Sequence, residues 1–157
     1  MAGFAIVRPD TAFANAAPKG KKRPREHDRD HLAWLATLPC IITGKRPVHV
    51  AHIRYADPVY GKGLTGTAEK PSDKWSVPLL ASLHLDGPDA QHGQNERLFW
   101  AKHGLDPLRI ALALHTNTGD DQQAEVILRE AWRTASAFET ALDRPSFNPE
   151  IQDGDHE

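Results

Sequence analysis

A short strand that runs directly into a long loop constrains this chain of 157 residues more than any other feature of its sequence. Residues 48–53 alternate with a period of two, which predicts a β-strand with Val48, Val50 and His52 on one face. Residues 55–74 contain three glycines and no apolar periodicity, so we predict a loop of a length that is usually functional or mobile in compact domains. The sequence thus places a histidine at the end of a strand, next to such a loop.

Two further segments are predicted to be extended. Residues 39–45 indicate a strand followed by a tight turn. Residues 75–85 are apolar but contain Pro78, which favours an edge strand or a strand-to-helix turn over a central strand.

Helix signals cover most of the rest of the chain. Four helices are predicted: one that Asp28 or Asp30 caps and Pro39 ends, one over residues 95–103 before Gly104, one that Asp106 and Pro107 open, and one from Asp120 to Pro145 with Gln123 at the capping-box position. The last helix carries an apolar stripe that includes Ile127, Leu128 and Phe138. Since a small hairpin buries little apolar surface, we expect this helix to complete the core.

Composition is that of an ordinary single-domain protein, with 39% hydrophobic and 25% charged residues. No apolar run approaches the roughly 20 residues of a membrane span, and the N-terminus lacks the pattern of a signal peptide. Cys40 is the single cysteine and cannot form an internal disulfide, which fits a reducing compartment. We therefore expect a cytoplasmic protein without a membrane partner.

Charge is divided unevenly along the chain. Residues 1–118 carry 16 Lys and Arg against 11 Asp and Glu, whereas residues 119–157 carry 3 against 10. A basic body with an acidic tail suits a nucleic-acid binder, although many solvated chains have similar asymmetry. We predict a flexible basic arm over residues 1–28, one domain over residues 29–143 and an acidic tail over residues 144–157.

His52 is the first candidate for chemistry. A neutral imidazole at a strand end can take a proton from water near pH 7, because its unperturbed pKa is about 6.5; a satisfied structural histidine is the alternative. Asp73 could orient His52 or a metal-bound water, or could be a turn or capping carboxylate. Arg54 follows the strand and could bind a phosphate oxygen in a bidentate manner.

His84 and His92 are candidate metal ligands. Imidazoles bind divalent ions such as Zn²⁺ and Mn²⁺, or Mg²⁺ together with a carboxylate. Residues eight positions apart on one helix are separated by about 12 Å, too far to share an ion, so a turn at residues 87–88 must bring them together. The alternative is that His92 caps the helix that follows, and that Asp86 and Asp89 are turn formers rather than ligands.

Four cations near these residues could follow a nucleic-acid backbone: Arg54, Lys62, Lys70 and Lys74. Ordinary surface cations are the alternative. Together with the histidines they make DNA the expected partner.

As a combined pattern, these residues resemble the HNH nuclease superfamily, also called the ββα-metal or His-Me finger superfamily. The resemblance is carried by Cys40, Ala51-His52-Ile53-Arg54, Lys70-Pro71-Ser72-Asp73, Val77-Pro78-Leu79, His84, the run from Asp86 to His92, Asn95-Glu96, Phe99-Trp100, Gly104 and Asp106-Pro107. The pattern covers about residues 30–115. More narrowly, it is similar to small phage and prophage HNH-type proteins related to the phage recombination-enhancement nuclease.

The resemblance implies an α+β fold: a small ββα-metal core, made of a β-hairpin and a short helix, wrapped by several α-helices, with disordered N- and C-terminal tails. It implies His52 as general base, His84 and His92 as ligands of one divalent ion (Mg, Mn or Zn), and Asp73 and Arg54 as supporting groups. The implied reaction is hydrolysis of DNA phosphodiester bonds in a bacterial host cell. A recombination or packaging protein is a candidate partner.

The sequence departs from the family pattern at a zinc-binding knuckle. Many relatives pair two Cys-x-x-Cys or Cys-x-x-His motifs around a structural zinc, but here only Cys40 is present. Thr43, Leu80 and Leu83 occupy the other three places. We expect no structural zinc, with apolar packing in its place.

A second departure concerns the metal ligands. Ala51 stands where an acidic ligand often precedes the base, so another donor is needed, with Asp73, Asp57 or His49 as candidates. The middle Asn of the family motif also lacks a clear counterpart, with Asp73 or Trp75 near its place. These departures keep two alternatives open: a catalytically weak or inactive nucleic-acid-binding accessory protein, and a structural protein whose histidines bind zinc to hold a loop.

Overall fold

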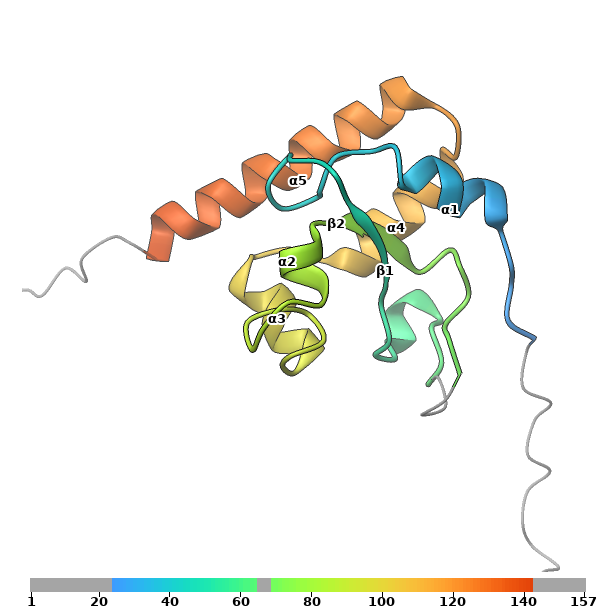
Figure 1. Ribbon diagram of the computed structural model, residues 1–157, viewed down its shortest axis with the longest axis horizontal. Helices are drawn as coiled ribbons and strands as arrows, with labels where there is room; N and C mark the ends of the chain where they lie inside the picture. The colour runs from blue at the N-terminus through green and yellow to red at the C-terminus, as the bar shows by residue number, and fades with distance from the viewer. Residues whose placement is uncertain (1–23, 65–68, 143–157) are drawn as a thin grey trace, which may run out of the picture.

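The structure, a computed structural model, describes residues 24–64 and 69–142. Residues 1–23 of the predicted basic arm and the whole of the predicted acidic tail, residues 144–157, lie outside the described residues. The elements follow in the order α1 (Arg29–Leu35), β1 (His49–His52), the 3-10 helix η1 (Pro58–Tyr60), β2 (Ser76–Leu79), α2 (Ala81–His84), α3 (Glu96–Lys102), α4 (Pro107–Thr116) and α5 (Asp121–Leu142). Figure 1 shows the small hairpin surrounded by helices, which confirms the predicted α+β class.

β1 and β2 form one antiparallel hairpin, in which His49 is opposite Leu79 and His52 is opposite Ser76. The strand predicted over residues 48–53 is therefore confirmed. Pro78 lies inside β2, and its carbonyl accepts a hydrogen bond of 3.0 Å from the amide of Ile41, on the side away from β1. Its nitrogen points to the same side, so the missing N–H is not needed by the hairpin.

Helices α4 and α5 build the core above the hairpin. α4 packs on β2, and α5 packs chiefly on α4 rather than on the strands (Figure 1). The inner face of α5 buries Ala124, Leu128 and Ala131, while the indole of Trp132 donates to the carbonyl of Cys40 at 2.9 Å. The long last helix thus completes the core, as the sequence predicts, through α4 as an intermediate layer.

The strand predicted over residues 39–45 is wrong. The amide of Gly44 donates to the carbonyl of Cys40 (2.9 Å), and the amide of Cys40 donates to the carbonyl of Lys45 (3.0 Å), which closes a turn. Gly44 has a φ of 70°, a conformation that glycine adopts without steric cost. Because this turn already begins at Cys40, the segment cannot pair with β2 as a strand, and only the amide of Ile41 forms a hydrogen bond to it.

The helix starts follow the capping residues. Asp28 is the cap of α1, since its side chain accepts a hydrogen bond from the amide of His31. Asn95 and Asp106 cap α3 and α4 in the same way, and Asp120 accepts from the amides of residues 122 and 123 at the start of α5. Each cap satisfies amides that would otherwise lack a partner in the first turn.

The four residues that the resemblance aligns with a zinc-binding knuckle differ in burial. Cys40 is fully buried in the hydrophobic core, and Leu80 and Leu83 pack against that core. Thr43 is exposed in the turn. Three of the four places therefore contribute to apolar packing.

No helix in the described part of the chain is long and apolar enough to span a bilayer.

Candidate active site

His52 and Asp73 lie together at one end of the hairpin. His52 is opposite Ser76, which brings it next to the segment that leads into β2. The Nε2 atom of His52 lies 3.1 Å from Oδ1 of Asp73. The side chain of His52 is 19% exposed, whereas Asp73 is 1% exposed. The predicted pair is therefore brought together, with its imidazole partly open to solvent.

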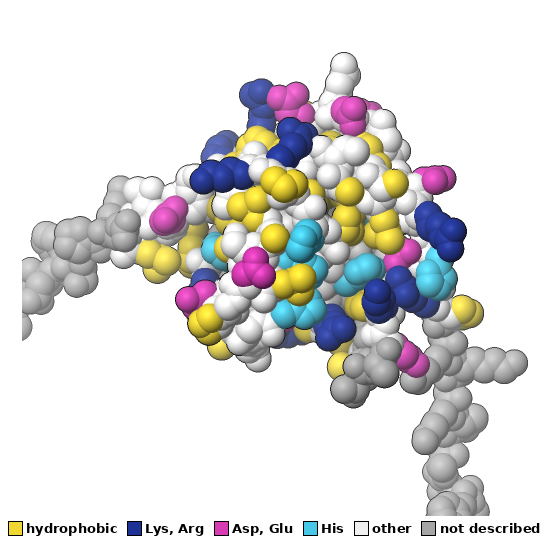
Figure 2. Space-filling model, viewed as in Figure 1, with side chains coloured by type: hydrophobic (Ala, Val, Ile, Leu, Met, Phe, Trp, Pro, Cys, Tyr) yellow, Lys and Arg dark blue, Asp and Glu magenta, His cyan; other side chains and the backbone are white. Residues whose placement is uncertain are grey.

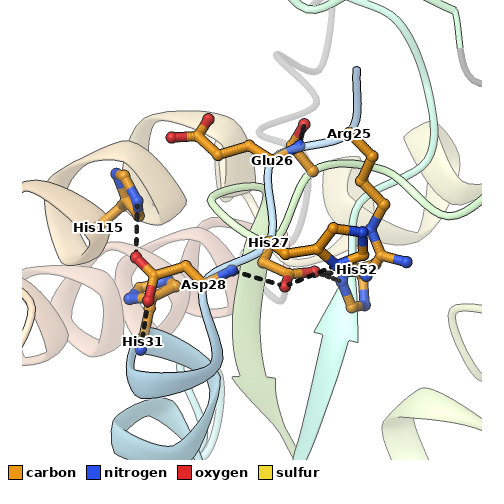
Figure 3. Close-up of polar contacts among 9 residues, drawn as sticks. Arg25, Glu26, His27, Asp28, His31, His52 and His115 are labelled. Atoms are coloured by element: carbon orange, nitrogen blue, oxygen red, sulfur yellow. Dashed lines mark hydrogen bonds and ion pairs between the residues drawn. The ribbon is translucent and has the colours of Figure 1, made fainter.

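Asp73 is held by the segment that precedes α1. Figure 3 shows Arg25 and His27 of this segment beside His52. Arg25 donates through Nη2 to Oδ1 at 2.5 Å, and the backbone amide of Asp28 donates to Oδ2 at 3.0 Å. Nδ1 of His27 lies 3.9 Å from Oδ2. Burial would raise the pKa of Asp73, but the hydrogen bonds from Arg25, Asp28 and His52 outweigh it and lower the pKa to about 2. Asp73 is thus an ionised, buried acceptor at neutral pH.

The state of Asp73 determines the tautomer of His52. An ionised carboxylate only accepts hydrogen bonds, so Nε2 of His52 must carry the proton that they share. The lone pair of the neutral ring is then on Nδ1. Burial lowers the pKa of His52 below its usual range, although the hydrogen bond to Asp73 acts in the opposite direction. His52 is therefore neutral near pH 7, with Nδ1 able to accept a proton.

Three further histidines gather at the other end of the hairpin. The ring centroids of His84 and His92 are 4.8 Å apart, and those of His84 and His49 are 5.6 Å apart. His49 reaches this place because it is opposite Leu79, the last residue of β2, and only Leu80 separates Leu79 from α2. We call His49, His84 and His92 the three-histidine cluster. Figure 2 shows histidine side chains gathered on one face beside Lys and Arg side chains.

The turn predicted at residues 87–88 brings His92 back to α2. The amide of Gln91 donates to the carbonyl of Leu83 at 2.8 Å, and the amide of His92 donates to the carbonyl of His84 at 3.2 Å. Asp57, another candidate donor, lies elsewhere: its side chain accepts from the amide of Val59 and caps η1. Among the three candidates for the additional donor, the one beside the predicted ligands is His49.

The three-histidine cluster has the chemistry of a metal site. Nδ1 of His84 is buried and has no hydrogen-bond partner among the described residues. Burial, followed by the imidazoles of His92, His49 and His52, lowers the pKa of His84 to about 4, so this ring is neutral at pH 7. A zinc-bound nitrogen lies about 2 Å from the ion, which places two ligating rings about 5 Å apart. The observed centroid distances fit that spacing.

The cluster is not a finished site. Within the described residues, no group of three or more His, Cys, Asp or Glu side chains is arranged to hold a metal ion. The rings must therefore turn about their side-chain dihedral angles before their nitrogens converge on one ion. The residues fit a borderline ion in number and type, and they require this local adjustment.

Gly93 follows His92 at a point where the backbone is too closely packed for a side chain. A Cβ at Gly93 would lie 2.2 Å from the carbonyl oxygen of Gly87 and 3.0 Å from the backbone of Pro88. We expect Gly93→Ala to destabilise the protein by about 1–3 kcal/mol, because backbone atoms must shift to admit the methyl group. Thermal melting measures this loss, with Gly63→Ala as the control, since among the described residues no atom beyond its chain neighbours lies within 4 Å of a Cβ there. Equal melting temperatures of the two variants would contradict the expectation.

The predicted cations fall into two kinds. Lys62 is 4% exposed, and its ammonium group donates to the carbonyls of Arg54 (3.1 Å) and Tyr55 (2.6 Å). The prediction that Lys62 contacts a nucleic-acid backbone is therefore wrong, because its charge is enclosed by the loop. Lys70 is exposed, and Lys74 lies 3.1 Å from the carboxylate of Glu26 at the surface.

Glu96 fastens the chain that follows β1. Its carboxylate accepts from the amides of Arg54 (2.9 Å) and Tyr55 (3.2 Å), and Gln91 donates both to Glu96 and to the carbonyl of His52. A polar pocket of about 160 Å³ lies here, lined by Arg54, Gln91, His92, Gln94 and Glu96. The exposed side chain of Arg54 thus lies beside the three-histidine cluster. A larger hollow on α5, of about 370 Å³, has no titratable side chain in its lining.

Two other histidines form a separate, structural group. His31 is fully buried, its Nδ1 lies 2.8 Å from the hydroxyl of Thr118, and its ring packs edge-on against His115 at 4.9 Å. The hydroxyl of Thr118 donates to the carbonyl of His115, so Nδ1 of His31 must be the donor. Burial and the neighbouring His115 lower the pKa of His31 to about 4. This group joins α1 to α4, and Asp28 lies 3.5 Å from His115.

Sequence reasoning missed Arg25 as a site residue, because it was assigned to a flexible arm. The signal for its role was the run Arg25-Glu26-His27-Asp28, in which every side chain is charged or titratable and which ends at the cap of α1. The role of Glu96 was likewise not predicted, since a carboxylate in a first helical turn is explained by the helix dipole alone.

Comparison of this chain with protein-family models, with curated proteins and with solved structures finds no match.

Proposed function

We propose that this chain is a metal-dependent DNA endonuclease of the HNH type, which hydrolyses phosphodiester bonds with His52 as its general base. The observation that carries the proposal is the placement of two groups around one small unit, which consists of β1, β2 and α2. The His52–Asp73 pair lies at one end of the hairpin, and the three-histidine cluster lies at the other. The order strand, strand, helix is the one that the ββα-metal core requires.

The two groups are close enough to act together. Three residues of a strand span about 10 Å, which is the separation of the His49 and His52 backbones. The imidazole of His52 is nevertheless near enough to that of His84 to lower its pKa. One phosphate and its neighbouring sugars extend over a comparable distance, and the proposal requires that a single substrate contacts both groups.

The residues divide the reaction between them. Nδ1 of His52 takes a proton from a water molecule, and that water attacks phosphorus. Asp73 keeps the ring in the Nε2–H tautomer and stabilises the imidazolium that forms. Arg54, exposed beside the three-histidine cluster, binds a phosphate oxygen. A divalent ion held by His49, His84 and His92 would, when bound, neutralise charge on the phosphate and on the leaving oxygen.

Cleavage of supercoiled plasmid and of single-stranded DNA circles tests the proposal. We expect nicking with at least one of Mg²⁺, Mn²⁺ and Zn²⁺, and none with EDTA. His84→Ala should lower the rate by more than the roughly 10- to 100-fold that follows loss of a group hydrogen-bonded to a metal ligand, because it removes the central member of the three-histidine cluster. His103→Gln is the control, a histidine that packs on Phe99 outside the site. Cleavage that persists in EDTA, or is equal in both variants, would contradict the proposal.

A nucleic-acid-binding accessory protein without catalytic activity is the second candidate. Ala51 favours it, since this position lacks the acidic side chain that precedes the base in many relatives of the HNH superfamily. For such a protein, the same assay gives no cleavage with any metal but a salt-sensitive gel shift with DNA. If the histidines instead bind zinc only to hold a loop, a chelator lowers the melting temperature and no phosphodiester is hydrolysed.

A further inference from the structure

We propose that Arg25 is a positioning residue of the site: through its hydrogen bond to Oδ1 of Asp73, it fixes the carboxylate that orients His52. The inference rests on the proposed function only in taking His52 as the base. It assigns a role to a residue that lies 27 positions before His52, in a segment outside the hairpin.

Residues 25–28 are bonded to residues 72–74, the segment that leads into β2, by hydrogen bonds and an ion pair. The amide of Glu26 donates to the hydroxyl of Ser72 at 3.1 Å, and the amide of Asp73 donates to the carbonyl of Glu26 at 3.0 Å. Lys74 forms an ion pair with the Glu26 carboxylate at 3.1 Å. These contacts hold Arg25 over Asp73, and Figure 3 shows its side chain on the same side as that of His52.

Arg25 and His52 share one oxygen atom. Oδ1 of Asp73 accepts from Nη2 of Arg25 at 2.5 Å and from Nε2 of His52 at 3.1 Å. A carboxylate as buried as Asp73 is costly unless a positive charge and hydrogen bonds compensate it. Arg25 supplies that charge, with 29% of its side chain exposed. Without it, the carboxylate loses the partner that keeps Oδ1 directed at the imidazole.

The charge of Arg25 also adjusts the basicity of His52. Arg25 and Lys70 lower the pKa of His52, while Asp73 raises it. His27 is a further titratable group on this face, 3.9 Å from Asp73. Removal of the Arg25 charge therefore raises the pKa of His52. In a reaction that needs the neutral ring, the acid limb of the rate profile then moves to higher pH.

Cleavage kinetics of the full chain with Arg25→Gln provide the first test. We expect kcat to fall by about 10- to 100-fold with little change in KM, because substrate contacts are retained while the base is misplaced. The acid limb should move to higher pH, and both Arg25→Lys and added guanidinium ion should restore part of the rate. Arg29→Gln is the matched control, since Arg29 is exposed in the first turn of α1 and carries the same charge. A rate and pH profile equal to those of Arg29→Gln would overturn the proposal.

An NMR titration of the His52 ring nitrogens provides a test that needs no activity. In the wild-type chain we expect the Nε2–H tautomer, and in Arg25→Gln a mixture of tautomers together with a higher pKa of His52. If His52 titrates identically in both proteins, Arg25 does not position the pair. If no metal supports cleavage, the proposed function fails, and the NMR comparison still decides the role of Arg25. Arg25→Lys covers the case in which the glutamine variant does not fold.

Discussion

His52→Ala is expected to reduce metal-dependent cleavage by about 100- to 10,000-fold, the usual contribution of a positioned general base. The ring is neutral near pH 7 because burial lowers its pKa, and Asp73 holds it in one tautomer. Alanine removes the proton acceptor and leaves Asp73 bonded to Arg25 and to the amide of Asp28. Initial nicking rates at saturating metal measure the effect.

Two controls separate lost chemistry from lost structure in His52→Ala. Zinc titration should give wild-type affinity, because His49, His84 and His92 are unchanged. Thermal melting should shift little, since the ring is partly exposed and lies at the end of a strand. A variant that binds metal, melts normally and still cleaves at the wild-type rate would exclude His52 as the base.

Truncation after Gly119 is expected to yield an unfolded or insoluble chain. It removes α5, whose buried face includes Ala124, Leu128 and Ala131. Full burial of a leucine such as Leu128 contributes about 2 kcal/mol to stability. The truncation also uncovers the face of α4 that α5 covers, and each large apolar residue exposed there costs a similar amount of stability. Their sum approaches the roughly 5–15 kcal/mol that separates folded from unfolded domains.

A chain that ends at Leu142 is the control for this truncation, since it retains all of α5 and lacks residues 143–157. It should melt cooperatively at nearly the temperature of the full chain. Circular dichroism and solubility after purification distinguish the two truncated chains. A soluble chain ending at Gly119 with a cooperative melt would show that α5 is not part of the core.

Local signals predicted much of the fold because they act within a few residues. The caps Asn95 and Asp106 accept hydrogen bonds from amides two and three positions ahead. The alternation in residues 48–53 similarly placed β1. Over residues 39–45 the local signals predicted the turn correctly, but the turn already begins at Cys40 and leaves no room for the predicted strand before it.

The site was predicted where it follows the hairpin and missed where it depends on distant contacts. The pairing of His52 with Asp73, and of His84 with His92, follows from residues near the two strands. Arg25 contacts Asp73 across 48 positions, a separation that no local pattern reports. Lys62 was misassigned because burial, which sequence does not display, turns its ammonium group toward two backbone carbonyls.

Asp28 contributes to the site through its backbone N–H group, which every residue except proline has. Its side chain caps α1, but its backbone N–H binds Oδ2 of Asp73. A side-chain scan at this position would report helix stability and would leave the bond to Asp73 unchanged, so the anchor would go undetected. In evolution this anchor depends on where the helix begins rather than on which residue begins it, and Ser, Thr or Asn would preserve it equally well.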